Sequence, residues 1–425
     1  MTERGGRRAV ITGMGVVAPG GLDVPEFWSC LTAGRTATRT ISLFDASLFR
    51  CQVAAECDFD PESRGLTPQE IRRMDRAVQL AVVATREALA DSGLVTGELA
   101  PHRTAVAIGN AVGSTMLMES EYTVISDGGR RWLCDEEYGV RHLYGAVVPS
   151  TAAAEVAWLS GAEGPAAVVS TGCTSGLDAV GYAAQLIEEG AADVVIGGAT
   201  DAPISPITVA CFDALKATST RNKEPERACR PFDLERDGLV LGEGAAVFVL
   251  EERGRAARRD AHVYCEVAGY ANRANAFHMT GLKPDGRELA EAITQALRSA
   301  GIAPEEVDYV NAHGSGTRQN DRHETAAFKR SLGDHARRVP VSSIKSMIGH
   351  SLGAIGAIEV AASALAIEHG VVPPTANLTT RDPECDLDYV PNHAREHRTD
   401  VVLSVGSGFG GFQTAVVLTS PRRLR

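Results

Sequence analysis

The sequence lacks a long hydrophobic run. Its longest apolar stretch, residues 353–367, contains Glu359 and falls short of the roughly 20 apolar residues that a membrane-spanning helix needs. The apolar run near the N-terminus is short and is broken by Gly13 and Gly15, which is not the pattern of an export signal. We therefore expect a buried helix over residues 353–367, no membrane partner and a cytoplasmic location.

An excess of positive charge and paired cysteines are also missing. The net charge of −12 argues against nucleic acid as a partner, because phosphate contact needs a basic surface. The nine cysteines include no C-x-x-C pair, which predicts reduced thiols and neither a disulfide framework nor a zinc site. We expect the eight cysteines other than Cys173 to be packing residues.

Short β-branched runs alternate along the chain with glycine turns and longer apolar helical patterns. This alternation predicts an α/β protein with buried sheets, and no low-complexity linker divides it. The clearest predicted strands are residues 104–109, 166–170, 193–198, 245–250 and 402–406.

A weak internal repeat indicates a duplicated fold. The segments A-A-V-V-S-T-G-C-T-S-G and V-P-V-S-S-I-K-S-M-I-G-H-S-L-G each combine a strand, a sharp turn and the start of an apolar helix, with Cys173 and His350 at matching positions. T-A-V-A-I-G-N-A-V-G-S-T and V-D-Y-V-N-A-H-G-S-G-T correspond in the same order. We expect halves of 1–260 and 261–425, whose facing helix starts bring Cys173 and His350 together.

Cys173 is the candidate nucleophile. It follows a strand and precedes an apolar helix in G-C-T-S-G, so we expect its sulfur at a helix N-terminus, where free N–H groups and the helix dipole favour a thiolate. The glycines permit a tight, exposed turn of the kind that presents a nucleophile. The alternative interpretation is a small buried cysteine at a packing site.

Two histidines and a lysine accompany it. His313 in N-A-H-G-S-G and His350 in G-H-S-L-G are each framed by glycine after a strand, which suits N–H donors to a thioester oxygen. We expect Lys345 near the end of an apolar strand, where a buried lysine needs a partner. Glu324 and Glu359 are the candidate partners, and a surface position for Lys345 is the alternative.

A metal centre and a phosphate loop are the alternatives to these interpretations. Four nearby side chains belong to types that bind metals, namely His313, Asp321, His323 and Glu324. Their spacing matches no zinc template such as H-E-x-x-H, so we expect a charge network and no metal. The glycine-rich segment 406–411 lacks the lysine of a phosphate-binding loop and is interpreted as a backbone segment that holds Phe409.

Four motifs in order resemble the β-ketoacyl-acyl-carrier-protein synthases. They are S-T-G-C-T-S-G, N-A-H-G-S-G-T, S-S-I-K-S-M-I-G-H-S-L-G-A-I-G-A and G-S-G-F-G-G-F-Q, and the resemblance continues through C-R-P-F-D-L-E-R-D-G-L-V-L-G-E-G-A-A over nearly the whole chain. It implies the thiolase fold, a duplicated five-layer αβαβα arrangement. It also implies an acyltransferase that forms carbon–carbon bonds by decarboxylative Claisen condensation.

The resemblance assigns roles to individual residues. It makes Cys173 the acceptor of the acyl chain and gives it an oxyanion hole formed by the N–H groups of Cys173 and Phe409, with Phe409 also gating acyl entry. It makes His313 and His350 the groups that hold the malonyl thioester and promote loss of CO2, without settling which acts in decarboxylation.

Further residues follow from the same resemblance. It makes Lys345 and Glu324 the groups that keep the histidines oriented and correctly protonated. Ser315 and Thr317 are the implied substrate-binding residues. No bound cofactor is implied, because the phosphopantetheine arm of an acyl carrier protein carries the substrate.

Details of the motifs resemble the α ketosynthase subunit of bacterial type II aromatic polyketide synthases more than fatty-acid elongation enzymes. H-G-S-G-T and G-F-G-G-F-Q stand where fatty-acid elongation predicts H-G-T-x-T and G-F-G-G-T-N. This implies a heterodimer with a homologous chain-length-factor subunit, with a homodimer as the alternative. Arg72, Arg73 and Arg221 match the basic positions that dock the carrier protein.

Alternative functions remain from other classes. A thiolase usually has a second catalytic cysteine near the C-terminus, and an initiating synthase pairs its cysteine with histidine and asparagine; neither fits. A non-catalytic length-setting scaffold would not need Cys173, both histidines and Lys345. A fatty-acid elongating synthase is the nearest alternative, distinguished by whether the β-keto groups are reduced between rounds.

Overall fold

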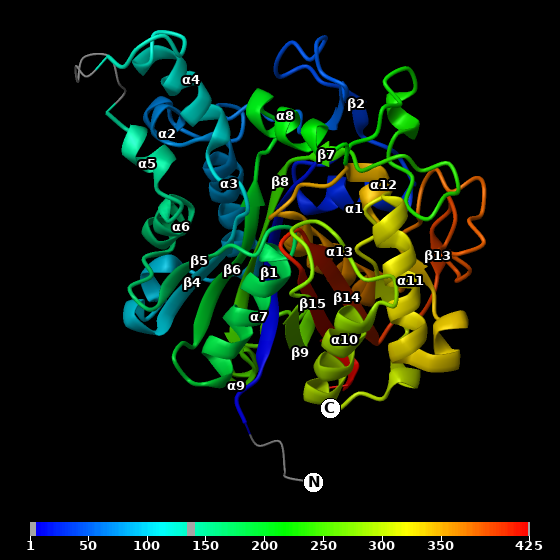
Figure 1. Cartoon of the computed structure of the whole chain (residues 1–425). Coiled ribbons are helices and arrows are strands. Elements are labelled where there is room, and N and C mark those ends of the chain that lie inside the picture. The colour runs from blue at the N-terminus through cyan, green and yellow to red at the C-terminus, as the bar shows by residue number, and fades with distance from the viewer. Residues whose placement is uncertain (1–5, 134–140, 424–425) are drawn as a thin grey trace.

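Ten strands hydrogen-bond into one mixed sheet in the computed structural model, which describes residues 6–133 and 141–423 (Figure 1). Five strands come from the first part of the chain: β1 (Ala9–Val17), β4 (Thr104–Gly109), β5 (Ala166–Val169), β6 (Val194–Asp201) and β8 (Gly244–Glu252). Five come from the second: β9 (Cys265–Ala274), β10 (Tyr309–Asn311), β11 (Val341–Ser342), β14 (Val401–Gly408) and β15 (Phe412–Thr419). Short strands elsewhere are β2 (Thr38–Thr40), β3 (Val53–Ala55), β7 (Leu241–Gly242), β12 (Val371–Val372) and β13 (Arg395–Glu396).

The two sets of five strands share one order. The first set runs β5-β4-β6-β8-β1 and the second runs β11-β10-β14-β15-β9, so in both the third strand along the chain is outermost and the first is innermost. The sets meet at β1 and β9 through only two residue pairs, Val10 with Glu266 and Ile11 with Cys265. The strands β4 and β10, and β5 and β11, therefore occupy equivalent positions, as the internal repeat predicts.

Helices cover both outer sides of the strands and fill the space between them (Figure 1). The main helices are α3 (Arg76–Ser92) and α6 (Thr151–Ser160) on the first set, α10 (Arg287–Ala300) and α11 (Arg318–Leu332) on the second, and α7 (Ser175–Glu188) and α13 (Ile355–His369) between them. Shorter helices are α1 (Val24–Thr32), α2 (Pro68–Arg73), α4 (Thr115–Ile125), α5 (Leu143–Val147), α8 (Pro206–Ala214), α9 (Arg253–Arg258) and α12 (Lys345–Ile348). Each set of five strands forms one sheet layer, and the order of the layers is helix, first set, helix, second set and helix.

The sequence pattern explains the burial of the central elements. All nine residues of β1 are buried, as expected for a strand covered on both faces. Every residue of α13 from Ile355 to Ile367 is buried, which agrees with its apolar character on all sides and with the buried helix predicted over residues 353–367. No helix within the described ranges is both long enough and apolar enough to cross a membrane.

Two glycines bring the central helices together at their N-terminal ends. A Cβ atom on Gly176 of α7 would lie 2.4 Å from the backbone nitrogen of Ala357. A Cβ atom on Gly356 of α13 would lie 2.6 Å from the backbone nitrogen of Leu177. Because both positions admit no side chain, the helices meet backbone to backbone, and the turns before them lie at one place.

Some local predictions are wrong. His350 does not begin a helix but lies between α12, which ends at Ile348, and α13, which begins at Ile355. Lys345 is the first residue of α12 and not part of a strand, because β11 ends at Ser342. Cys211 is exposed and is no packing residue, whereas the other described cysteines are buried. Cys134 lies outside the described residues.

Candidate active site

Cys173 lies in the turn between β5 and α7 and is 9% exposed. Burial raises the pKa of its thiol to about 11, and this outweighs the opposing effects of the Phe409 N–H group and the positive charge of Lys345. The predicted thiolate is therefore wrong for the free protein. The helix begins at Ser175, two residues later, and the dipole acts mainly within the first turn, whereas desolvation disfavours the charged sulfur directly.

The Cys173 turn packs against the turn between β14 and β15. The backbone N–H groups of Phe409 and of Cys173 itself are directed at the Cys173 sulfur. A Cβ atom on Gly172 would lie 3.2 Å from the Phe409 carbonyl oxygen, and one on Gly408 would lie 3.0 Å from the Thr171 carbonyl oxygen. These glycines allow two backbone N–H groups from different halves of the chain to point at one small space.

The backbone of His313, just after β10, is held from both sides. Glu324 accepts hydrogen bonds from the N–H groups of His313 at 2.5 Å and of Gly314 at 2.8 Å. The Lys345 Nζ donates to the His313 carbonyl oxygen at 2.5 Å. Within the ring, Nδ1 is buried and has no hydrogen-bond partner among the described residues. The position of the ring is thus set by its backbone and by packing.

His350 has a defined tautomer. The N–H group of Leu352 donates to its Nδ1 at 3.2 Å, so the proton of the neutral ring is on Nε2. The rings of His350 and His313 meet edge to face with centroids 5.2 Å apart. Burial and the charge of Lys345 hold the pKa of both histidines well below its usual value. Both rings are therefore neutral near pH 7.

Lys345 is completely buried and its ion-pair partner is Glu359. Glu324 is not that partner, because both of its oxygens accept backbone N–H groups. Burial raises the pKa of Glu324 to about 8 and that of Glu359 to about 7. The two candidate partners of Lys345 therefore differ: Glu359 pairs with the lysine, and Glu324 holds the backbone of His313.

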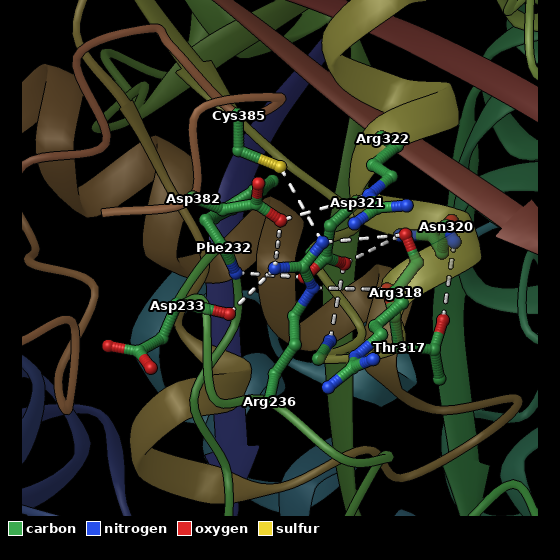
Figure 2. Close-up of polar contacts among 12 residues, drawn as sticks. Phe232, Asp233, Arg236, Thr317, Arg318, Asn320, Asp321, Arg322, Asp382 and Cys385 are labelled. Atoms are coloured by element: carbon green, nitrogen blue, oxygen red, sulfur yellow. Dashed lines mark hydrogen bonds and ion pairs between the residues drawn. The ribbon is translucent and has the colours of Figure 1, made fainter. Parts of the chain in front are cut away.

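Arg236 lies at the centre of a network of polar contacts beside Thr317 and Asp321 (Figure 2). No sequence pattern predicted it as a site residue. It is fully buried and forms ion pairs with Asp321 at 3.0 Å and Asp382 at 2.8 Å. Asp321 in turn accepts the N–H group of Gly316 at 3.3 Å. Arg236 thus ties the H-G-S-G-T turn and the first turn of α11 to the loop of Asp382. Its only sequence signal is its place in F-D-L-E-R-D-G.

One cavity of about 480 Å³ joins these groups, a volume within the usual range for ligand sites. Its lining includes Cys173, His313, Ser315, Thr317, His350 and Phe409. The hydroxyls of Ser315 and Thr317 lie 3.0 Å apart. Within the described ranges, no cluster of three or more histidine, cysteine or acidic residues has a metal-binding arrangement.

The three candidate docking arginines do not line this cavity. Arg72 is exposed at the end of α2. Arg73 forms a two-pronged ion pair with Glu155, at 2.9 and 2.6 Å. Arg221 lies 3.4 Å from Glu235 and 3.6 Å from Glu224. Two of the three charges are thus already compensated within the chain.

Comparisons with known proteins agree with this geometry. The N-terminal domain of the β-ketoacyl synthases matches residues 6–256, and the C-terminal domain of the same enzymes matches residues 264–379. The chain belongs to the β-ketoacyl synthase family, whose members are acyltransferases that form carbon–carbon bonds.

Individual relatives narrow the class. The chain is 65% identical over 425 residues to the tetracenomycin polyketide synthase ketoacyl synthase alpha subunit of Streptomyces glaucescens, covering 100% of both chains. It is 44% identical over 414 residues to the 3-oxoacyl-[acyl-carrier-protein] synthase 2 of Coxiella burnetii, covering 97% of this chain and 98% of that protein. Within the family it is thus a ketosynthase of the type II polyketide synthase α-subunit kind.

Solved structures confirm the predicted thiolase fold. A type II polyketide synthase ketosynthase, bound to a hexaketide and in complex with its acyl-carrier protein, superposes with a TM-score of 0.91 at 37% identity, covering 98% of this chain and 99% of that chain. The ishigamide ketosynthase/chain length factor superposes with a TM-score of 0.89 at 34% identity, covering 98% and 99%.

Proposed function

We propose that this chain extends a poly-β-keto chain in type II polyketide biosynthesis, with Cys173 as the nucleophile. One observation carries the proposal: a single cavity holds the Cys173 sulfur, two N–H groups directed at it and two neutral histidines. Acyl transfer, enolate formation and carbon–carbon bond formation need these three elements together.

In the first step, the Cys173 sulfur attacks the thioester of an acyl carrier protein. The negative charge of the tetrahedral intermediate is placed on the oxygen that faces the N–H groups of Cys173 and Phe409. The bond between the acyl carbon and the carrier's sulfur then breaks, and the thiol proton of Cys173 ends on the departing carrier thiolate. Since the pKa of Cys173 is about 11 in the free protein, this proton leaves as the attack proceeds.

In the second step, a malonyl thioester loses CO2 and the electron pair forms an enolate. His350 donates its Nε2 proton to the thioester oxygen as a hydrogen bond, and His313 contributes from the adjacent ring. The enolate carbon attacks acyl-Cys173, the carbon–sulfur bond to Cys173 breaks, and the Cys173 thiolate that leaves takes up a proton from solvent. Neutral rings suit this task because a neutral N–H donor that is already oriented costs no reorganisation as the charge develops.

Lys345 and Glu324 act as positioning residues. They hold the carbonyl oxygen and the N–H group of His313, and the charge of Lys345 adds to the effect of burial in lowering the pKa of both histidines. Phe409 supplies its N–H group, and its ring, stacked on Phe212 with centroids 6.0 Å apart, closes the acyl side of the cavity. Ser315 and Thr317 would bind the phosphopantetheine arm, which is the carrier of the substrate and needs no resident cofactor.

The partners are an acyl carrier protein and a homologous chain-length-factor subunit, or a second copy of this chain. The outermost strand β5 supports a homologous partner: Ala166 is exposed and the other three residues are only half-buried. Trp158 of the neighbouring α6 is 71% exposed. A partner of the same fold can add its own edge strand here and cover these apolar side chains.

Two further points belong to the proposal. We place the boundary between the two halves near residue 260, supported by the repeated strand order. We place the enzyme in the cytoplasm, supported by the free cysteines of the described residues, none of which is in a disulfide.

Reconstitution tests the function. The purified chain, a length-factor subunit, holo carrier protein and a malonyl donor, without reductases, should give unreduced poly-β-keto products or their aromatic shunt products by mass spectrometry. Cys173→Ala should abolish them, whereas a scaffold subunit would still support them. A single condensation by the chain alone, with reduction required before the next round, would instead identify a fatty-acid elongating synthase.

A further inference from the structure

A buried carboxylate, Asp178, lies directly behind the nucleophile turn. It is on the first turn of α7 and is 3% exposed. Its Oδ2 accepts hydrogen bonds from the hydroxyls of Thr171 at 2.5 Å and Thr174 at 2.8 Å. These two threonines flank Gly172 and Cys173, so Oδ2 holds both ends of the turn that presents the sulfur.

The other oxygen of Asp178 reaches the second half of the chain. Its Oδ1 accepts hydrogen bonds from the hydroxyl of Tyr270 on β9 at 2.9 Å and from that of Thr414 on β15 at 2.9 Å. Thr414 pairs with Gly406 across the hairpin of β14 and β15, whose turn contains Phe409. Oδ1 therefore holds the hairpin that supplies the Phe409 N–H group.

The Cys173 turn and the Phe409 turn touch each other backbone to backbone, without side chains between them. Gly408 lies against the Thr171 carbonyl oxygen and the Cys173 nitrogen, and Gly172 lies against the Phe409 carbonyl oxygen. The relative position of the two N–H groups therefore depends on how the two turns are fastened together. Asp178 bonds through one rigid group to the Cys173 turn and to the strand that follows the Phe409 turn.

We infer that Asp178 is a positioning residue for the oxyanion hole, which it assembles by fastening the Cys173 turn to the hairpin of Phe409. The inference rests on the proposed function. A carboxylate suits four hydroxyl donors because it only accepts hydrogen bonds. An amide in its place would present N–H groups to one pair of hydroxyls, which would have to turn from donors into acceptors, and this would weaken the hold on that side.

The chemistry of the two steps provides a test that separates positioning from general damage. Acyl transfer to Cys173 needs the oxyanion hole, whereas decarboxylation of malonyl-carrier protein depends on His313 and His350. Loss of one oxyanion donor slows a reaction by about 10²–10³-fold, and a displaced donor should cost somewhat less. Asp178→Asn should therefore slow acyl transfer by roughly 10- to 100-fold and leave CO2 release nearly unchanged.

The experiment uses the chain with its partner subunit. Acylation of Cys173 by acyl-carrier protein is followed by intact-protein mass spectrometry, and CO2 release from malonyl-carrier protein is measured separately. Thr414→Val is a second variant, which keeps the shape of the side chain and cuts only the tie to the hairpin. It should slow acyl transfer selectively, by about tenfold or less.

Asp308→Asn is the matched control. Asp308 also fastens chain segments, by accepting the N–H groups of Asp400 and Val401 at the opposite end of β14, but it lies away from the cavity. It should leave the ratio of the two rates as in the unaltered protein.

Equal loss of both rates in Asp178→Asn and Thr414→Val, or no loss in either, would overturn the inference while leaving the proposed function intact. An unaltered protein whose Cys173 is not acylated, or a Cys173→Ala variant that is acylated equally, would overturn the proposed function and the inference with it.

Discussion

The two sides of the cavity are held by different chemistry. On the side of Cys173, the supporting contacts behind the turn are hydroxyls that converge on Asp178. On the side of the histidines, the supporting groups are mostly charged: Lys345 with Glu359, and Arg236 with Asp321 and Asp382. Both sides are buried, so the difference is not one of solvent access.

The difference corresponds to what each side has to control. The Cys173 side has to place two N–H groups, which requires geometry and little charge. The histidine side has to place two rings and also keep them neutral, and burial together with the positive charge of Lys345 lowers the pKa of both. A buried charge is costly unless it is paired, so the charged network stands where a protonation state must be fixed.

Replacement of Lys345 should have the largest effect on this arrangement. Lys345→Met removes the hold on the His313 carbonyl oxygen and the charge that adds to the effect of burial in keeping the rings neutral. It also leaves Glu359 buried without its ion-pair partner. We expect condensation to fall by at least about 100-fold and the free energy of unfolding to fall by about 3–5 kcal/mol, as for other broken buried pairs. Stopped assays of product formation measure the condensation rate, and denaturant titrations measure the free energy of unfolding.

The pH dependence of this loss has a definite sign. The pKa of Glu359 is already raised to about 7 by burial, and Lys345 lowers it; without the lysine it rises further. The stability contributed by the neutral Glu359 carboxyl is present at low pH and is lost as the pH rises through the raised pKa. The reduction in the free energy of unfolding that Lys345→Met causes should therefore be greater at pH 8 than at pH 6. Lys345→Met with Glu359→Gln should recover stability but not activity; recovery of both would show that Lys345 only stabilises the fold.

The sequence predicts the residues that line the site better than the buried residues that support them. The glycine-framed turns and the internal repeat predict that Cys173 and His350 meet, and the resemblance to the ketosynthases adds Lys345, Glu324 and Phe409. Arg236 and Asp178 have partners that are distant in the chain, such as Thr414, which is 236 residues from Asp178. No spacing pattern reveals such pairs, because only the fold brings them together.

The pKa of Cys173 was predicted in the wrong direction for a related reason. A helix start is visible in a sequence, but the extent of burial around a sulfur is not. The desolvation of Cys173 comes from neighbours such as Phe212 and Phe409 in distant segments. The sign of the shift depends on which of the two effects is larger, and only the folded structure shows it.

The direction of the Cys173 pKa shift can be measured on the free protein. Because the pKa of Cys173 is about 11 and the thiolate is the reactive form, alkylation of Cys173 by iodoacetamide should accelerate by about tenfold per pH unit between pH 7 and 9. Cys211→Ser provides a background without the exposed thiol, and peptide mass spectrometry assigns the label. A rate that levels off below pH 8 would instead show that the helix start prevails over burial.

The smallest effect is expected at the docking arginines, which differ in whether their charge is paired within the chain. Arg72 is exposed, whereas Arg73 is engaged by the buried Glu155. Arg72→Ser should raise KM for the acyl carrier protein by a few-fold at low salt, and the effect should shrink as salt screens the attraction. Arg73→Ser should instead reduce the free energy of unfolding by about 1–3 kcal/mol, because it leaves a buried carboxylate unpaired. A salt-dependent KM effect of equal size in both variants would show that pairing within the chain does not remove Arg73 from carrier-protein recognition.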